Sequence, residues 1–215
     1  MRRSAPATML FAALAGPSFA DGGAALVVGA PRGALGTVAD VAGGLAGHLV
    51  LPSGGRHLSL RVEGSWLIYG SETVRVPRPR TAGRLAREIV TDNWVASLGI
   101  GPQLVLPLGG VRPYLHAFAG VTYISTTSQL REDPFFASAP TTNFDDTAVA
   151  YGGGGGLLVP LRGRALSLDL GARYVRTGTV RFLGEGDLGR DGDARATPHR
   201  GRANVLEFRL GLNFE

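Results

Sequence analysis

The sequence predicts an all-β protein, an antiparallel up-and-down eight-stranded transmembrane β-barrel. Three observations predict this fold class. Apolar and polar residues alternate in segments that cover most of the chain. Short and long connections alternate between these segments, and aromatic residues gather near one end of several of them. Alternation with period two gives a strand one apolar and one polar face. Short turns that alternate with long loops are typical of membrane barrels.

The composition excludes several classes of protein. The chain has 215 residues, with 33 Gly, no Cys and 22 basic residues, all of them Arg, against 17 acidic residues. Without Cys there is no disulfide scaffold, no Cys-based zinc site and no Cys nucleophile. The glycines lack the three-residue period of collagen. The net charge of +5 comes from the first residues and from one loop, so we expect no nucleic-acid partner.

Residues 1–20 have the pattern of a secretory signal peptide. Arg2 and Arg3 form a basic start, residues 9–16 are apolar, and Ser18 and Ala20 supply small residues at a cleavage site. The apolar run is too short for a spanning helix. We therefore expect a signal peptide over 1–20 and one barrel domain over 21–215, exported to a bacterial envelope.

The first four expected strands cover 23–31, 40–51, 57–70 and 89–106. The first is needed because a chain that starts on the periplasmic side must cross once before the strand at 40–51 can return. The strand at 40–51 is rich in Gly and alternates less clearly. In 57–70, Leu58, Leu60, Val62, Trp66 and Ile68 oppose Ser59, Arg61, Glu63, Ser65 and Tyr69. In 89–106, Trp94, Ala96, Leu98, Ile100, Leu104 and Leu106 oppose Asn93, Ser97, Gly99, Gly101 and Gln103.

The other four expected strands cover 112–126, 146–160, 165–179 and 202–214. In the first, Leu115, Ala117, Ala119, Val121 and Tyr123 oppose Arg112, Tyr114, His116, Gly120 and Thr122. The run 146–160 contains five consecutive glycines and is less decisive. In 165–179, Leu166, Leu168, Leu170, Ala172 and Tyr174 oppose Ser167, Asp169, Gly171, Arg173 and Thr177. In 202–214, Leu206, Phe208, Leu210, Leu212 and Phe214 oppose Glu207, Arg209, Gly211 and Asn213.

The connections fall into two sets. The tight turns at 52–55, 107–110 and 161–164 are rich in Gly and Pro or contain Gly between arginines. The expected long loops cover about 71–88, 127–145 and 181–201, and a shorter loop at about 32–39 joins the first two strands. This alternation places the short turns on the periplasmic side and the long loops outside.

The aromatic residues indicate which face of each strand points outward. Trp66, Trp94, Tyr123 and Tyr174 all lie on the apolar face, near the long-loop end of their strands. Such a band is typical of the aromatic girdle at a membrane interface. Charged residues share the opposite face with Gly and Ser, as a narrow polar lumen requires. A soluble lipocalin-like barrel, suggested by Gly64 and Trp66, is disfavoured because this pair lies well inside the chain.

With these residues in place, the chain resembles the small eight-stranded outer-membrane barrel family, typified by the outer-membrane protein A-like transmembrane barrel. The resemblance covers nearly all of 21–215 and is architectural, without a point motif. The alternating last strand resembles the assembly signal of that family, although Glu215 follows the terminal aromatic Phe214. The resemblance implies the outer membrane of a diderm bacterium, and the outer-membrane assembly machinery as a partner of the last strand. It leaves the function open.

Charged residues with inward parity form the candidate site. They are Arg61, Glu63, Asp169, Arg173, Glu207 and Arg209, with His48, Arg112 and His116. An eight-stranded interior is just wide enough to be filled by side chains, and a buried charge needs a partner. We therefore expect an ion-pair network that fills the lumen, with Asp169 or Arg173 contacting Glu207 or Arg209 on the neighbouring strand. A gated ion path and a proton relay are the alternatives.

Two loops carry further candidates. The loop 71–88 contains Arg75, Arg78, Arg80, Arg84 and Arg87. Guanidinium groups suit phosphate, so these residues are candidate lipid-phosphate contacts, with a solvated loop as the simpler interpretation. The loop 185–193 collects four carboxylates among glycines, and its spacing differs from that of an EF-hand. We expect no metal and no cofactor, and calcium in this loop is an alternative.

These observations favour a structural or surface-interaction role for a monomeric outer-membrane barrel. We expect the outer-membrane lipid as its surroundings and an unidentified ligand at its surface. A narrow, porin-like pore for ions or very small solutes is one alternative, and a lipid-modifying enzyme is the other. No catalytic residue is assigned, because no spacing argument assembles a Ser, a His and a carboxylate.

Overall fold

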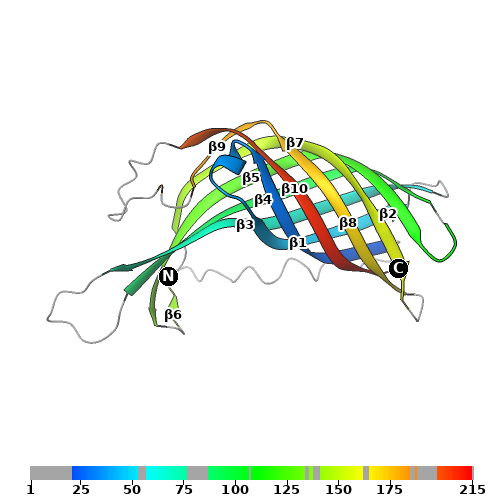
Figure 1. The fold of residues 1–215 in the computed structure, drawn as a ribbon, viewed down its shortest axis with the longest axis horizontal. Helices are drawn as coiled ribbons and strands as arrows, with labels where there is room; N and C mark the ends of the chain where they lie inside the picture. The colour runs from blue at the N-terminus through cyan, green and yellow to red at the C-terminus, as the bar shows by residue number, and fades with distance from the viewer. Residues whose placement is uncertain are drawn as a thin grey trace, which may run out of the picture.

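In the computed structural model, eight antiparallel strands close a barrel in chain order (Figure 1). The described residues are 21–52, 57–76, 87–106, 108–133, 136–137, 141–161, 165–184, 187 and 198–214, so the expected signal peptide lies outside them. The wall strands are β1 (Asp21–Gly33), β2 (Ala42–Pro52), β3 (Leu58–Val76), β4 (Arg87–Val105), β5 (Arg112–Asp133), β7 (Thr141–Pro160), β8 (Leu166–Thr177) and β10 (His199–Phe214). The last strand, β10, pairs with β1 and closes the wall. The predicted fold class is confirmed.

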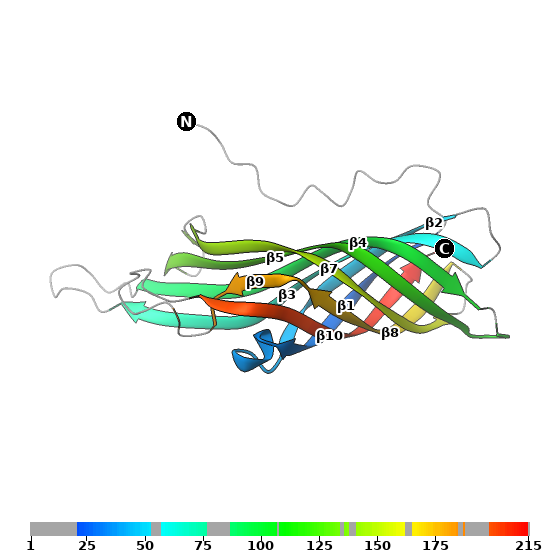
Figure 2. The ribbon, with the colours of Figure 1, turned by 90° about the horizontal axis from the view of Figure 1, so that it is seen from above.

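The strand register sets the tilt of the wall. A path of paired positions runs from Pro52 through Ser59, Gln103, His116, Gly154, Arg173, Glu207 and Gly29 back to Ala42, ten residues away along β2. A stagger of this kind inclines the strands of a barrel by about 35–45° to its axis. Figures 1 and 2 show this inclination. Inward side chains from distant strand positions therefore meet at one height.

Two of the expected long loops are shorter than predicted. The pairing of β3 with β4 continues from Ser71–Asp92 to Val76–Arg87. The pairing of β5 with β7 likewise reaches Ser128–Thr141. Backbone groups outside the membrane still need hydrogen-bond partners, and extending each hairpin supplies them. The residues 71–76 and 127–133 therefore belong to strands, and a two-residue strand, β6 (Phe136–Ala137), adds to the edge of β5.

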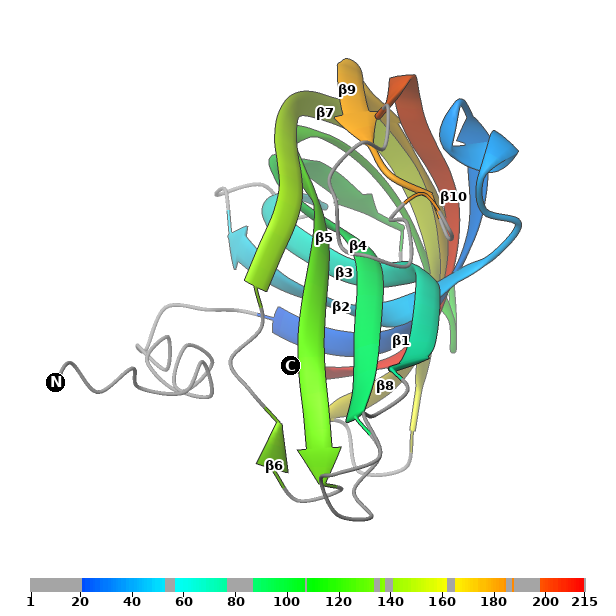
Figure 3. The same ribbon diagram turned by 90° about the vertical axis from the view of Figure 1, so that its left-hand side faces the viewer.

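The strand β9 (Thr179–Phe182) continues β8 after Gly178 and pairs with the start of β10. At the same end of the barrel, the first connection forms a single 3-10 turn, η2 (Leu35–Thr37). Within the described residues, no helix has the length and apolar character needed to cross a membrane. Figure 3 looks along the barrel from this end and shows the strands around its interior.

The outer surface of the barrel is apolar. Leu26, Leu115 and Val149 are 65%, 62% and 66% exposed, whereas the inward Glu63 and Glu207 are each 1% exposed. A water-soluble protein buries such apolar side chains and exposes such charges, so this surface is the reverse of a soluble one. The predicted outward and inward faces are therefore confirmed.

Aromatic rings lie together on this outer surface, towards the end that carries β6 and β9. The rings of Trp66 and Trp94 lie 6.5 Å apart, and those of Trp94 and Tyr123 lie 5.4 Å apart. Tyr174 is also exposed on the outer face. Tyr151 is also exposed, on β7 beside these strands. It was not predicted from the sequence, because the adjoining glycines obscure the alternation there.

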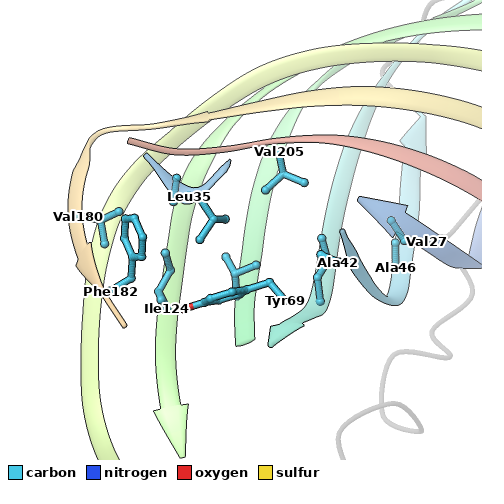
Figure 4. Packing of buried hydrophobic residues seen from close by; sticks show 12 residues of the cluster. Val27, Leu35, Ala42, Ala46, Tyr69, Ile124, Val180, Phe182 and Val205 are labelled. Atoms are coloured by element: carbon cyan, nitrogen blue, oxygen red, sulfur yellow. The ribbon is translucent and has the colours of Figure 1, made fainter. Parts of the chain in front are cut away.

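The charged residues of the barrel interior occupy only one half, and large apolar side chains fill much of the other, which corrects the expectation of a polar lumen. Twelve buried residues form an apolar cluster towards the external end, among them Val27, Leu67, Tyr69, Ile124 and Phe182 (Figure 4). Phe182, Ile124 and Leu35 have no exposed surface. The interior of so narrow a barrel is filled by side chains, and apolar ones can close it without needing charged partners.

The two faces can be tested at Leu210, which is 51% exposed on the outer face of β10. If the surrounding medium is lipid, Leu210→Arg should lower the free energy of unfolding by about 2–4 kcal/mol near the midplane. Thr179→Arg, also exposed but beyond the aromatic residues, should cost less than about 1 kcal/mol. The measurement is urea unfolding in lipid vesicles, followed by tryptophan fluorescence. Equal costs for both variants would contradict the assignment of the apolar surface to lipid.

Candidate functional site

The charged half of the lumen draws its side chains from four strands. Arg61 and Glu63 come from β3, His116 from β5, Arg173 from β8, and Glu207 and Arg209 from β10. Each lies on the inward face of its strand, and each is at most 6% exposed. The stagger of the barrel brings these positions to one height, so that residues of non-adjacent strands meet.

Glu63 is the centre of this network. Its Oε2 lies 2.8 Å from Nε of Arg61 and 3.3 Å from NH1 of Arg209. Its Oε1 lies 2.8 Å from NH1 of Arg173 and 3.4 Å from Nδ1 of His116. One carboxylate thus contacts three guanidinium groups and an imidazole from four strands. Such contacts offset the high cost of holding the carboxylate away from water.

A second carboxylate, Glu207, binds Arg173 from the neighbouring strand. The Nε of Arg173 donates to Oε2 at 2.7 Å, and its NH2 donates to Oε1 at 3.1 Å. This two-point geometry is the strongest form of an Arg–carboxylate contact. Ser65 donates to Oε1 of Glu207 at 3.1 Å and accepts from Arg173 at 2.6 Å. The structure thus contains one of the neighbouring-strand pairs that the sequence predicts.

The remaining expected pairs differ from the structure. Asp169 accepts a hydrogen bond from the hydroxyl of Tyr114 at 2.7 Å. The NH2 of Arg209 lies 3.2 Å from Nε2 of His116, so Arg209 reaches across the lumen. The stagger of the wall explains these partners. Residues that face the lumen at one height are not the residues that are paired in register on neighbouring strands.

Arg112 lies at the start of β5, nearer the short-turn end of the barrel than the rest of the network. Its NH2 donates to Oγ of Ser167 at 3.2 Å. Arg112 was expected among the central charges, but the described contact connects it to Ser167 near the start of β8. It therefore lies beside the network and outside the contacts of Glu63.

Four more residues complete the network. His48 was a lumen candidate from the sequence, whereas Gln103, Tyr114 and Asn213 were not assigned as site residues. Gln103 accepts from NH1 of Arg61 at 2.7 Å, and the Arg61 guanidinium lies 5.5 Å from the centroid of the Tyr114 ring. His48 and Asn213 are joined at 2.9 Å. All four have inward parity, which is the signal that could have included Gln103, Tyr114 and Asn213.

Glycines make room for the large inward side chains. A Cβ at Gly156 or at Gly171 would lie 2.7 Å or 2.6 Å from the Tyr114 hydroxyl. A Cβ at Gly154 would lie 2.5 Å from Cβ of Arg173. Contacts this short force other atoms to move. The glycine run on β7 is therefore the wall against which the network packs.

The external end of the lumen is closed by the apolar cluster and by chain that crosses it. Leu183 follows β9, and its carbonyl accepts a hydrogen bond from the Tyr69 hydroxyl at 3.1 Å. Tyr69 belongs to β3, which faces β8 across the barrel because four pairings separate them in either direction. Leu35 of η2 packs into the same cluster. The segment after β9 and the first connection therefore cover the mouth together.

The loop candidates are only partly described. The backbones of Arg75 and Arg87 lie in β3 and β4, whereas Arg78, Arg80 and Arg84 lie outside the described residues. Of the loop 185–193, for which calcium is the alternative to the expected absence of a metal, Asp187 is described. It accepts from the backbone of Gly184 at 2.6 Å and lies 3.0 Å from Nε2 of His199.

No protein-family model and no curated protein matches the chain. Among solved structures, it is similar to Neisserial surface protein A, with a TM-score of 0.51 and 15% identity over 90% of this chain and 95% of that chain. Similarity to the attachment invasion locus protein Ail of Yersinia pestis has a TM-score of 0.48 at 10% identity, over 90% of this chain and 95% of that one. The first likeness shows that the chain has the fold of small eight-stranded outer-membrane barrels.

The central position of Glu63 can be tested by its removal. Glu63→Ala leaves three buried guanidinium groups without their common partner, and breaking a buried pair of this kind costs about 3–5 kcal/mol. We expect that loss in the free energy of unfolding, measured by urea titration of the folded barrel in detergent. Glu72→Ala, on the external part of the same strand, should cost less than about 1 kcal/mol. Equal losses would mean that water reaches the lumen and screens the network.

Proposed function

We propose that this chain is an outer-membrane protein of a diderm bacterium, whose closed barrel is a scaffold for its external hairpins. The observation that carries the proposal is the filled interior, where an apolar cluster and a charged network follow one another along the barrel axis. The apolar outer surface supports the membrane location. A signal peptide over residues 1–20 belongs to the same proposal, because an outer-membrane protein must be exported.

The filled interior favours a scaffold over a pore. A passing ion would have to displace Phe182 and its neighbours and then separate Arg173 from both Glu63 and Glu207. Each of these guanidinium–carboxylate contacts is at most 2.8 Å long. Breaking such contacts in a buried site is costly, so the two layers oppose passage independently.

The external hairpins are the part of the molecule that supports a surface-interaction role. Polar side chains bridge their strands: Ser71 donates to Asp92 at 2.6 Å, and the hydroxyls of Thr91 and Ser128 lie 2.7 Å apart. Asn143 donates to Ser128 at 2.6 Å. A surface ordered before contact loses less entropy when a partner binds. These hairpins are therefore suited to binding a partner outside the cell.

A catalytic role has less support than a scaffold. Ser65 contacts Glu207 and Arg173, and His116 contacts Glu63, but these groups lie inside the barrel and are at most 7% exposed. A lipid substrate approaches from the opposite side of the wall. The proposal is therefore a non-catalytic and monomeric barrel that needs no cofactor.

Planar-bilayer recording tests the closed lumen. We expect no conductance steps from the wild-type protein, because either layer alone blocks the path. Phe182→Ala, which thins only the apolar layer, should remain silent. Phe182→Ala combined with Arg173→Ala should produce steps, because it opens both layers.

Heat-modifiable migration in gels will verify that each variant is folded. Large, stable conductance of the wild-type protein would contradict the scaffold and favour the pore.

A further inference from the structure

Four arginines lie on the outer wall of the barrel at its external end, away from the β3–β4 hairpin. Arg32 belongs to β1, Arg176 to β8, and Arg200 and Arg202 to β10. All four side chains are exposed. The three strands are neighbours in the wall, with β10 in the middle (Figure 1). We call these four residues the arginine rim.

The arginine rim faces outward and not into the lumen. Arg176 shares the outward face of β8 with Tyr174, two residues before it. Arg200 and Arg202 share the outward face of β10 with Phe208, and Arg32 shares that of β1 with Leu26 and Val28. These four apolar neighbours are all exposed on the apolar surface. The rim therefore borders the same medium that covers the apolar wall.

Aromatic residues indicate the position of the arginine rim along the barrel axis, relative to the lipid headgroups. The Arg176 guanidinium lies 5.8 Å from the centroid of the Tyr151 ring on the adjacent strand, which holds the charge against the outer wall. Tyr and Trp rings of membrane proteins lie at the level of the lipid headgroups. Arg176 lies two residues beyond Tyr174 on the same face of β8, towards the outside. Arg202 and Arg200 lie further towards the outside on β10. The rim thus begins where lipid headgroups begin.

The charges of the rim are poorly compensated by the protein. Arg200 is paired in register with Arg181 of β9, and like charges directly opposite each other destabilise a sheet. Asp146 lies 3.4 Å from Nε of Arg181 and accepts from its backbone amide at 2.9 Å. That amide holds the pKa of Asp146 below its usual range. Asp146 is thus already paired with Arg181.

For Arg32, Arg200 and Arg202, the described part of the chain offers no carboxylate at ion-pair distance, although Asp145 is exposed on nearby β7. An anion from outside the protein would relieve the repulsion between neighbouring guanidinium groups. The ligand must be anionic, must lie at headgroup height and must approach from the lipid side. Phosphate meets the first condition, and guanidinium groups bind it with two parallel hydrogen bonds.

We propose that the arginine rim binds the phosphate groups of an anionic lipid in the external leaflet. The site differs from the candidate contacts on the loop 71–88, of which Arg75 and Arg87 have their backbones in β3 and β4. It presupposes the membrane location proposed above. It is independent of the closed lumen, because a conducting barrel could bind the same lipid.

Native mass spectrometry of the folded barrel in neutral detergent can test the site, with bisphosphorylated lipid A as the probe. The test variant is Arg176→Gln/Arg200→Gln/Arg202→Gln. We expect its affinity for the probe to fall about 100-fold, because each arginine near a membrane surface contributes to anionic-lipid binding. Since the three side chains are exposed, thermal unfolding should be unchanged.

The matched control is Arg75→Gln/Arg87→Gln on the opposite hairpin, which should lower the affinity much less. Dephosphorylated lipid A should bind weakly to the wild-type protein, and millimolar inorganic phosphate should not displace the intact lipid. Equal affinities of wild type and rim variant would overturn the proposal, as would a larger loss in the hairpin control. Full displacement by inorganic phosphate would overturn the lipid as ligand. Failure of the membrane location would be seen separately, as a wild-type protein that does not float with vesicles.

Discussion

The contact of one carboxylate with guanidinium groups from several strands organises the interior. Glu63 on β3 meets Arg173 on β8 and Arg209 on β10, although β3 pairs in the wall with β2 and β4 only. The contact fixes the distance between opposite walls, because a charge drawn back from its partners would remain buried and unpaired. Gly154 and Gly156 of β7 follow from the same constraint, since a Cβ at either position would displace Arg173 or Tyr114.

The two layers of the interior stabilise the barrel in different ways. The apolar layer gains from removing side chains such as Phe182 and Ile124 from water, which depends on area and not on direction. The charged layer offsets the cost of its own burial only when every partner is in place, so it accepts only one arrangement of partners. The apolar layer therefore holds opposite walls of the barrel together, and the charged layer selects the register of the strands.

Much of the fold was predictable from the sequence, because side chains that alternate in a strand must separate into two faces. The pair Arg173–Glu207 was also predictable, since its members lie directly opposite on neighbouring strands. The reach of Arg209 to Glu63 was not, because it depends on the stagger of the whole barrel. The apolar layer was missed because Leu67 and Tyr69 share inward parity with Glu63, and parity alone does not separate the two halves of a lumen.

The distribution of the network over the chain has a kinetic consequence. Glu63 lies on the third wall strand, whereas Arg209 lies on the last one, so the contacts of Glu63 are complete only when β10 has joined β1. Until then the carboxylate and the guanidinium groups face the gap between β1 and β10 and stay hydrated. Much of the energy of the charged layer is thus released in the final step of assembly. A half-closed barrel gains little from it, and closure therefore approaches an all-or-none event.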